Sequence, residues 1–138
     1  MILVLDTNVV VAGLLWHGAP NRLLQVAIDR RIELATSVAL LEELERVLTR
    51  AKFAKQLARQ SVSPRMLLDR YAIISDAVVP ASIPRVARYP DDDRILACAI
   101  AGQADLVVSG DSDLLNLKAY QRIPIVGVSE ALSRLRRG

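Results

Sequence analysis

The chain has 138 residues, of which 52% are apolar, which is enough to bury a core and excludes a disordered chain. Its single cysteine excludes a disulfide framework and a cysteine-based zinc cluster, and its single histidine, His17, cannot by itself form a histidine-rich metal site. The net charge is +3; if the acids gather in a site, the remaining surface is more basic than this total, which favours a polyanionic partner.

Hydrophobic spacing, capping residues and prolines predict an alternation of strands and helices. In chain order, the predicted elements are a strand at residues 2–5, a helix at 21–30, a strand at 33–35, helices at 38–50, 52–60 and 64–74, a strand at 77–79, a loop at 80–90, a helix at 91–101, strands at 104–109 and 123–128, and a helix at 130–136. Gly102 is expected to end the helix before it, and Pro124 is expected to place its strand at a sheet edge.

This order of elements predicts an α/β fold with three α/β/α layers and a central, mainly parallel sheet of about five strands. We expect a single domain over residues 1–138. The apolar start is too short for a signal peptide, and no apolar run approaches the ~20 residues of a membrane span. The sequence therefore predicts a cytoplasmic protein without a membrane segment.

Two acidic clusters follow the two clearest predicted strands. Asp6 comes directly after residues 2–5, and Asp111 and Asp113 come after residues 104–109. Turns and helix caps also favour aspartate, which is the simpler explanation of each cluster alone. The carboxyl ends of neighbouring parallel strands meet at one edge of a sheet, however, so these carboxylates are expected to lie close together. A bound divalent cation is the simplest way to offset their repulsion.

Two predicted helices add further acids. In the helix at 38–50, about 100° of rotation per residue turns Glu42 away from the apolar stripe and places Glu43 and Glu45 on its opposite edges. The helical phase therefore leaves Glu43 and Glu45 both open as site residues. The acidic run 91–93 opens a later helix, with more acids than capping requires.

A set of ligands made of carboxylates, with no cysteine sulfur and no cluster of histidines, suits hard ions such as Mg²⁺ or Mn²⁺. Four carboxylates carry four negative charges, which two divalent ions would match. Two such ions can activate a water molecule and stabilise the leaving oxygen of a phosphodiester, with no need for histidine or cysteine. The residues therefore predict metal-assisted hydrolysis of phosphodiester bonds.

Four stretches carry these acids: Leu5-Asp6-Thr7-Asn8, Glu43-Leu44 with Val47-Leu48, Asp93-Arg94-Ile95-Leu96-Ala97, and Val107-Val108-Ser109-Gly110-Asp111-Ser112-Asp113. In order and spacing they resemble the PIN domain, the metal-dependent nuclease fold of VapC-like toxins, over nearly the whole chain. The resemblance implies a ribonuclease that cleaves single-stranded RNA as the toxin of a toxin–antitoxin pair. It also implies a homodimer, inhibited by a cognate antitoxin protein that enters the active-site groove.

The resemblance assigns roles to individual residues as well. It marks a catalytic and metal-binding quartet of Asp6, Glu43, Asp93 and Asp111. It implies that Asp113 is an auxiliary metal ligand or an acid that supports the ligands, and it chooses Glu43 over Glu45 and Asp93 over Asp92. The polar residues that it implies as supports of the site are Thr7, Asn8, Asp92 and Ser109.

Several basic residues are candidates for guiding the RNA backbone. They are Arg46, Arg50 and Lys52, together with Lys55, Arg59, Arg134, Arg136 and Arg137. Trp16 and Tyr89 are candidates for stacking on bases, although aromatic rings at these positions can also cover the core.

Two other functions remain open. A magnesium-dependent phosphatase of the haloacid-dehalogenase type also places an aspartate after its first strand, but it needs a second aspartate two positions later, where this chain has Asn8. A non-catalytic RNA-binding PIN-like domain is the alternative from a different class, and the intact set of acids argues against it.

Overall fold

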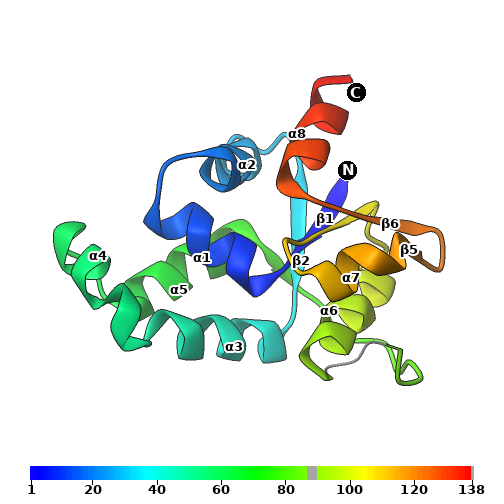
Figure 1. Ribbon diagram of the computed structural model, residues 1–138, viewed down its shortest axis with the longest axis horizontal. Coiled ribbons are helices and arrows are strands. Elements are labelled where there is room, and N and C mark those ends of the chain that lie inside the picture. Colours follow the sequence, from blue (N-terminus) through cyan, green and yellow to red (C-terminus); the bar gives the residue numbers. More distant parts are fainter. Residues whose placement is uncertain (87–89, 138) are drawn as a thin grey trace.

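The computed structural model describes residues 1–86 and 90–137, in which helices cover both faces of a sheet (Figure 1). The strands are β1 (Ile2–Leu5), β2 (Glu33–Thr36), β3 (Asp76–Ala77), β4 (Leu106–Val108), β5 (Ala119–Tyr120) and β6 (Ile123–Val126). The helices are α1 (Thr7–Leu15), α2 (Ala19–Ile28), α3 (Val38–Leu48), the 3-10 turn η1 (Ala51–Phe53), α4 (Ala54–Arg59), α5 (Pro64–Ile74), α6 (Pro90–Ala101), α7 (Ser112–Leu117) and α8 (Val128–Arg137). The end of the predicted loop at 80–90, including Tyr89, lies outside the described residues.

The described strands form a six-stranded sheet in the order β3-β2-β1-β4-β6-β5. Every pairing is parallel except the antiparallel pairing of β5 with β6. The predicted α/β class with a mainly parallel sheet is therefore confirmed. The strands β2 and β3 extend the sheet on one side of β1, and β4, β6 and β5 extend it on the other side. The direction of strand order therefore reverses between β1 and β4, and open sheets of this kind bind ligands at such a point.

The alternation of side chains along the central strands divides the core into two layers. Leu3 and Leu5 of β1 pack with residues of α1, α2, α3, α5 and α8 on one face of the sheet. Val4 points to the other face, where it packs with residues of α6 and α7. The helices of these two layers lie on opposite sides of the sheet in Figure 1. Successive side chains of a strand point to opposite faces of the sheet, so helices cover both faces and the expected three layers result.

The described sheet has six strands where about five were expected, because β5 had no predicted counterpart, and two further features differ from the prediction. The apolar stretch after Asp6 had no predicted element, and it forms α1 because the Asp6 side chain accepts a hydrogen bond from the Asn8 amide and caps the helix. The expected edge position of the strand at 123–128 is wrong, because β5 covers that side of β6. Pro124 is tolerated there because the pairing of β6 with β4 begins only at Ile125, after the residue that lacks an amide hydrogen. No described helix combines the length and apolarity that crossing a membrane requires.

Gly102 follows α6 for a reason other than the expected one. The left-handed backbone after the helix is adopted by Gln103, whose φ is 53°. A Cβ atom on Gly102 would lie 2.9 Å from the Cβ of Ala35 in β2 and 3.2 Å from the Cys98 carbonyl oxygen. Glycine is therefore required because the end of α6 approaches the sheet closely.

We expect the substitution Gly102→Ala to lower the free energy of unfolding by about 1–3 kcal/mol, because the short Ala35 side chain cannot move aside. Chemical denaturation measures this change. Gly110→Ala is the matched control, since nothing lies within 4 Å of its added Cβ, and it should unfold like the wild type. Equal stability of the two variants would contradict the close approach of α6 to β2.

Candidate functional site

The ends of β1 and β4 are joined by one buried serine. The Ser109 hydroxyl donates a hydrogen bond of 2.6 Å to Oδ2 of Asp6, and its oxygen accepts one of 2.9 Å from the Asp111 amide. Asp6 and Ser109 are both buried, and Leu5 pairs with Val108 directly before them. The two acidic clusters that follow these strands therefore belong to one site, as expected for neighbouring parallel strands.

Asp111 holds the start of α7. Its Oδ1 accepts hydrogen bonds from the amides of Asp113 at 2.7 Å and Leu114 at 3.3 Å. Asp111 is therefore a helix cap, which is the simpler of the two roles expected for it from the sequence. Only one carboxylate oxygen is used for this purpose. The other oxygen of Asp111 and the carboxylate of Asp113, in the first turn of α7, remain available to a ligand.

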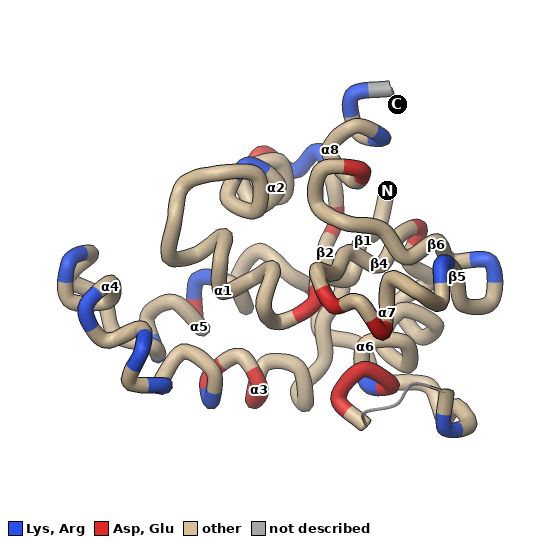
Figure 2. The backbone as a smooth tube through the Cα atoms, viewed as in Figure 1, with Lys and Arg blue, Asp and Glu red and all other residues tan. Residues whose placement is uncertain are grey.

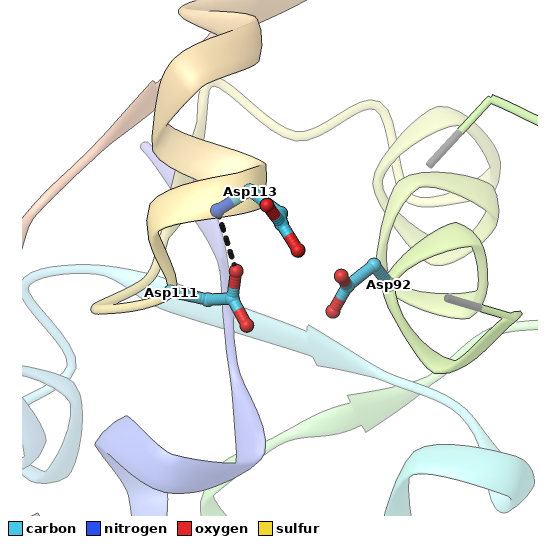
Figure 3. A group of neighbouring side chains, drawn as sticks. All are labelled: Asp92, Asp111 and Asp113. Atoms are coloured by element: carbon cyan, nitrogen blue, oxygen red, sulfur yellow. Dashed lines mark hydrogen bonds between the residues drawn. The ribbon is translucent and has the colours of Figure 1, made fainter. Parts of the chain in front are cut away.

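Asp92 completes the cluster from α6. One carboxylate oxygen each from Asp92, Asp111 and Asp113 lies within 4.8 Å of the other two. Figure 3 shows the carboxylate of Asp92 pointing from α6 toward the two aspartates of α7. Asp92 is only 8% exposed, and its Oδ2 has no hydrogen-bond partner among the described residues. A buried oxygen atom of this kind is costly unless a ligand binds it.

Asp93 points elsewhere. Its Oδ1 accepts a hydrogen bond of 3.1 Å from the Val86 amide, and its Oδ2 lies 3.1 Å from Nε of Arg85. It therefore ties the segment before α6 to the helix, whereas its neighbour Asp92 faces the acidic cluster. Of the two neighbours, Asp92 belongs to the acidic cluster, and the predicted Asp93 does not. A sequence signal for Asp92 exists, because it precedes the buried Leu96 and Ala99 by four and seven residues and so shares their face of the helix.

Glu43 joins the site from α3. Its Oε2 accepts a hydrogen bond of 3.0 Å from the Thr7 hydroxyl, next to Asp6. Glu45 instead lies 3.7 Å from Arg65 of α5, and Glu42 is exposed. The structure thus separates the two glutamates that the helical phase left open.

Burial and mutual repulsion shift the titration of these acids. The pKa of Asp92 is raised to about 6, first by burial and then by the negative charges of Asp111, Asp6, Asp113 and Asp91. Burial also raises the pKa of Asp6 and of Glu43 above their ordinary values, against the hydrogen bonds from Ser109 and from Thr7 respectively. The fold therefore holds carboxylates that resist ionisation together, and a positive charge would relieve this cost.

The donor set fits a hard divalent cation. All the converging ligand atoms are carboxylate oxygens, and Asp92 has a buried oxygen, Oδ2, without a partner among the described residues. The negative charge of Asp6 raises the pKa of Asp92 and also that of Glu43, so Asp6 lies near both of them. An all-oxygen arrangement of this kind suits a hard divalent cation.

The predicted basic residues of η1 and α4 lie away from the acidic cluster. Lys and Arg gather at η1 and α4, at the end of the molecule remote from α6 and α7 (Figure 2). Arg46, Arg50 and Lys52 are all exposed, and Arg46 is close enough to Glu43 to lower its pKa. The structure thus does not bring Arg50 and Lys52 into the acidic site itself.

Comparison with known proteins identifies the family. The sequence model of the PIN domain matches residues 2–113, so the chain belongs to the PIN domain family, as the resemblance predicted. Among solved structures, a chain of VapBC2 from Rickettsia felis, crystallised bound to a DNA fragment from its promoter, has a similar fold with a TM-score of 0.62. The two chains are 18% identical, and the match covers 92% of this chain and 98% of the other. No curated protein sequence matches the chain at a significant level.

We expect Asp92→Asn to raise the free energy of unfolding by on the order of 1 kcal/mol at pH 7 in the presence of a chelator. The reason is that Asp92 has a raised pKa, so its ionised form is less favourable in the folded protein than in the unfolded chain. Asparagine keeps the shape and removes the charge. Urea denaturation with EDTA measures the change, and Asp29→Asn, at an exposed position after α2, is the control. A loss of stability in Asp92→Asn would contradict the assigned repulsion.

Proposed function

We propose that this PIN domain is a ribonuclease that depends on Mg²⁺ or Mn²⁺ and hydrolyses phosphodiester bonds of single-stranded RNA. The observation that carries the proposal is the convergence of Asp92, Asp111 and Asp113, with one buried oxygen that lacks a partner in the described part of the chain. In the proposed site Asp92 replaces Asp93 as the ligand from α6. The metal ligands we propose are Asp6, Asp92, Asp111 and Asp113, with Glu43 on the α3 side.

The side chains around these ligands orient them. The Ser109 hydroxyl donates a hydrogen bond to one oxygen of Asp6, and the other oxygen faces the start of α1, where the Asn8 amide lies 3.3 Å away. Thr7 orients Glu43 in the same way. When bound, the divalent cations supply an activated water molecule and stabilisation of the leaving oxygen. The acids can therefore supply the catalytic centre without a histidine or cysteine.

The distribution of charge supports a polyanionic substrate. The cations of α3, η1 and α4 form no ion pair with other described residues, and they are all exposed: Arg46, Arg50, Lys52, Lys55 and Arg59. Unpaired surface cations of this kind attract the phosphates of a nucleic acid. We propose that this basic surface guides the RNA, while the acidic cluster binds metal.

A regulatory partner is part of the proposal. The similar chain belongs to VapBC2, whose structure was determined with promoter DNA, and the resemblance of this chain to VapC-like toxins implies a toxin–antitoxin pair. We propose that the chain acts as such a toxin in the cytoplasm, as a homodimer, and that a cognate antitoxin protein blocks its site.

The test is cleavage of a single-stranded RNA by the purified chain with Mg²⁺ or Mn²⁺, compared with the same reaction in EDTA. We expect cleavage only with metal. Asp6→Asn and Asp92→Asn should each reduce the rate by about 100-fold or more, because each removes a charged ligand from the proposed metal site.

Asp93→Asn is the matched control, since it removes a neighbouring carboxylate that contacts Arg85 and Val86 instead of the cluster. It should retain activity within a few-fold of the wild type. Cleavage that persists in EDTA would refute the metal-dependent mechanism. A larger loss in Asp93→Asn than in Asp92→Asn would return the ligand role to Asp93.

A further inference from the structure

A pocket of about 370 Å³ lies between the C-terminal end of α1 and α4, away from the acidic cluster. It is called the α1–α4 pocket below, and the residues that line it and carry the argument are Trp16, His17, Asn21, Gln56 and Gln60. It combines an aromatic ring with several amide groups. The proposed catalytic site uses none of these side chains.

Trp16 provides an aromatic surface at the rim. It is 46% exposed, although it is a large apolar side chain. Phe53 of η1 supports it in a tilted arrangement with 5.9 Å between ring centroids, and Nζ of Lys52 lies 5.1 Å from the centre of the Phe53 ring. The ring is thus held in place, with a cation beside its support, and nearly half of its surface remains available for stacking.

The two glutamines of α4 have fixed orientations. Nε2 of Gln56 and Nε2 of Gln60 each donate a hydrogen bond of 2.6 Å to the carbonyl oxygen of Leu15. A carbonyl only accepts hydrogen bonds, so this contact determines which end of each amide faces α1. The Oε1 atoms are therefore turned away from Leu15, and they accept no hydrogen bond from the described residues. Two such acceptors beside an exposed ring match the amino groups on the edge of a nucleobase.

The surroundings and the distance fit a nucleic-acid strand. Lys52, Lys55 and Arg59, on η1 and α4, are exposed cations without ion pairs among the described residues. Asp6 caps the start of α1 and Trp16 its end, and a rise of 1.5 Å per residue along the helix separates them by roughly 15 Å. A few nucleotides of single strand span such a distance.

We propose that the α1–α4 pocket binds one base of the RNA, a few nucleotides from the bond that is cleaved. This inference rests on the proposed RNA substrate and adds a specificity site to it. The base stacks on Trp16, and its amino group donates to Gln56 or Gln60, so adenine and cytosine are preferred to uracil. The cations of α4 hold the neighbouring phosphates.

The protein reports on this pocket directly, because Trp16 is its only tryptophan. The experiment titrates the full-length chain, in EDTA to prevent cleavage, with short oligoadenylate, oligocytidylate and oligouridylate. Tryptophan fluorescence and the anisotropy of a labelled oligonucleotide are followed together. We expect quenching that saturates with the binding curve, and weaker binding of oligouridylate.

Variants separate stacking from general affinity. Trp16→Leu should weaken binding about 5- to 150-fold, the loss of one stacked base, and Trp16→Phe should restore most of it. Replacing both Gln56 and Gln60 by Leu should remove the preference for oligocytidylate over oligouridylate. Tyr120→Leu, on β5, is the aromatic control and should bind like the wild type. Circular dichroism confirms that each variant is folded.

The outcomes distinguish this inference from the proposed function. RNA binding without quenching, or unchanged affinity in Trp16→Leu, would overturn the pocket and leave the nuclease proposal intact. Quenching by a partner protein but not by RNA would also overturn it. Absence of both RNA binding and metal-dependent cleavage in the wild type would overturn the RNA substrate itself, and the pocket with it.

Discussion

The hydrogen bond between the Ser109 hydroxyl and Asp6 connects the two halves of the acidic site, at the point where the two central parallel strands end. Because Leu5 and Val108 are paired in the sheet, the residues that follow them have little freedom to separate. The same serine oxygen accepts the Asp111 amide and so fixes the start of α7. The rest of the site depends on this constraint, since α7 carries Asp113 and both acids of α7 face Asp92.

The arrangement is unfavourable without a ligand. Asp92 is buried with an oxygen that no described residue satisfies, and four neighbouring carboxylates raise its pKa further. Stability is therefore sacrificed at the site, which is common where a fold prepares a binding function. The packing of the core offsets this loss of stability. The strands β1 and β4 are buried on both faces, and the helices that carry the acids pack against them. A group of cations lies at η1 and α4, on the part of the molecule away from α6 and α7, so a basic surface is separate from the acidic cluster.

Much of the fold could be predicted from the sequence, because strand-like apolar runs and helix caps are local signals. The helix α5 begins and ends where Pro64 and Ile74 predicted it, but the helix α1 was missed, since its almost entirely apolar residues have no helical stripe. The position of β6 inside the sheet could not be predicted from Pro124 alone, because it depends on where the pairing with β4 begins.

The candidate site was predictable at its strand ends and less so on its helices. Asp6 and Asp111 follow buried strands, so topology alone brings them together. Glu43 and Glu45 both lie at an edge of the apolar stripe of α3, so the helical phase does not choose between them. Only their tertiary contacts, with Thr7 and with Arg65 respectively, distinguish them. The phase of α6 places Asp92 on the buried face of the helix, whereas the resemblance marks Asp93, and our proposal of Asp92 as the ligand follows the contacts of the two side chains. Side-chain partners such as Val86 and Arg85 become visible only in three dimensions.

The central claim is that the acidic cluster is a cation site, and Mn²⁺ binding measured by electron paramagnetic resonance tests it most directly. The signal of free Mn²⁺ should fall as the wild-type chain is added, Mg²⁺ should compete, and saturating metal should raise the melting temperature. Asp92→Asn should bind much more weakly than Asp93→Asn. Absence of Mn²⁺ binding at millimolar concentration in the folded wild type would contradict the account.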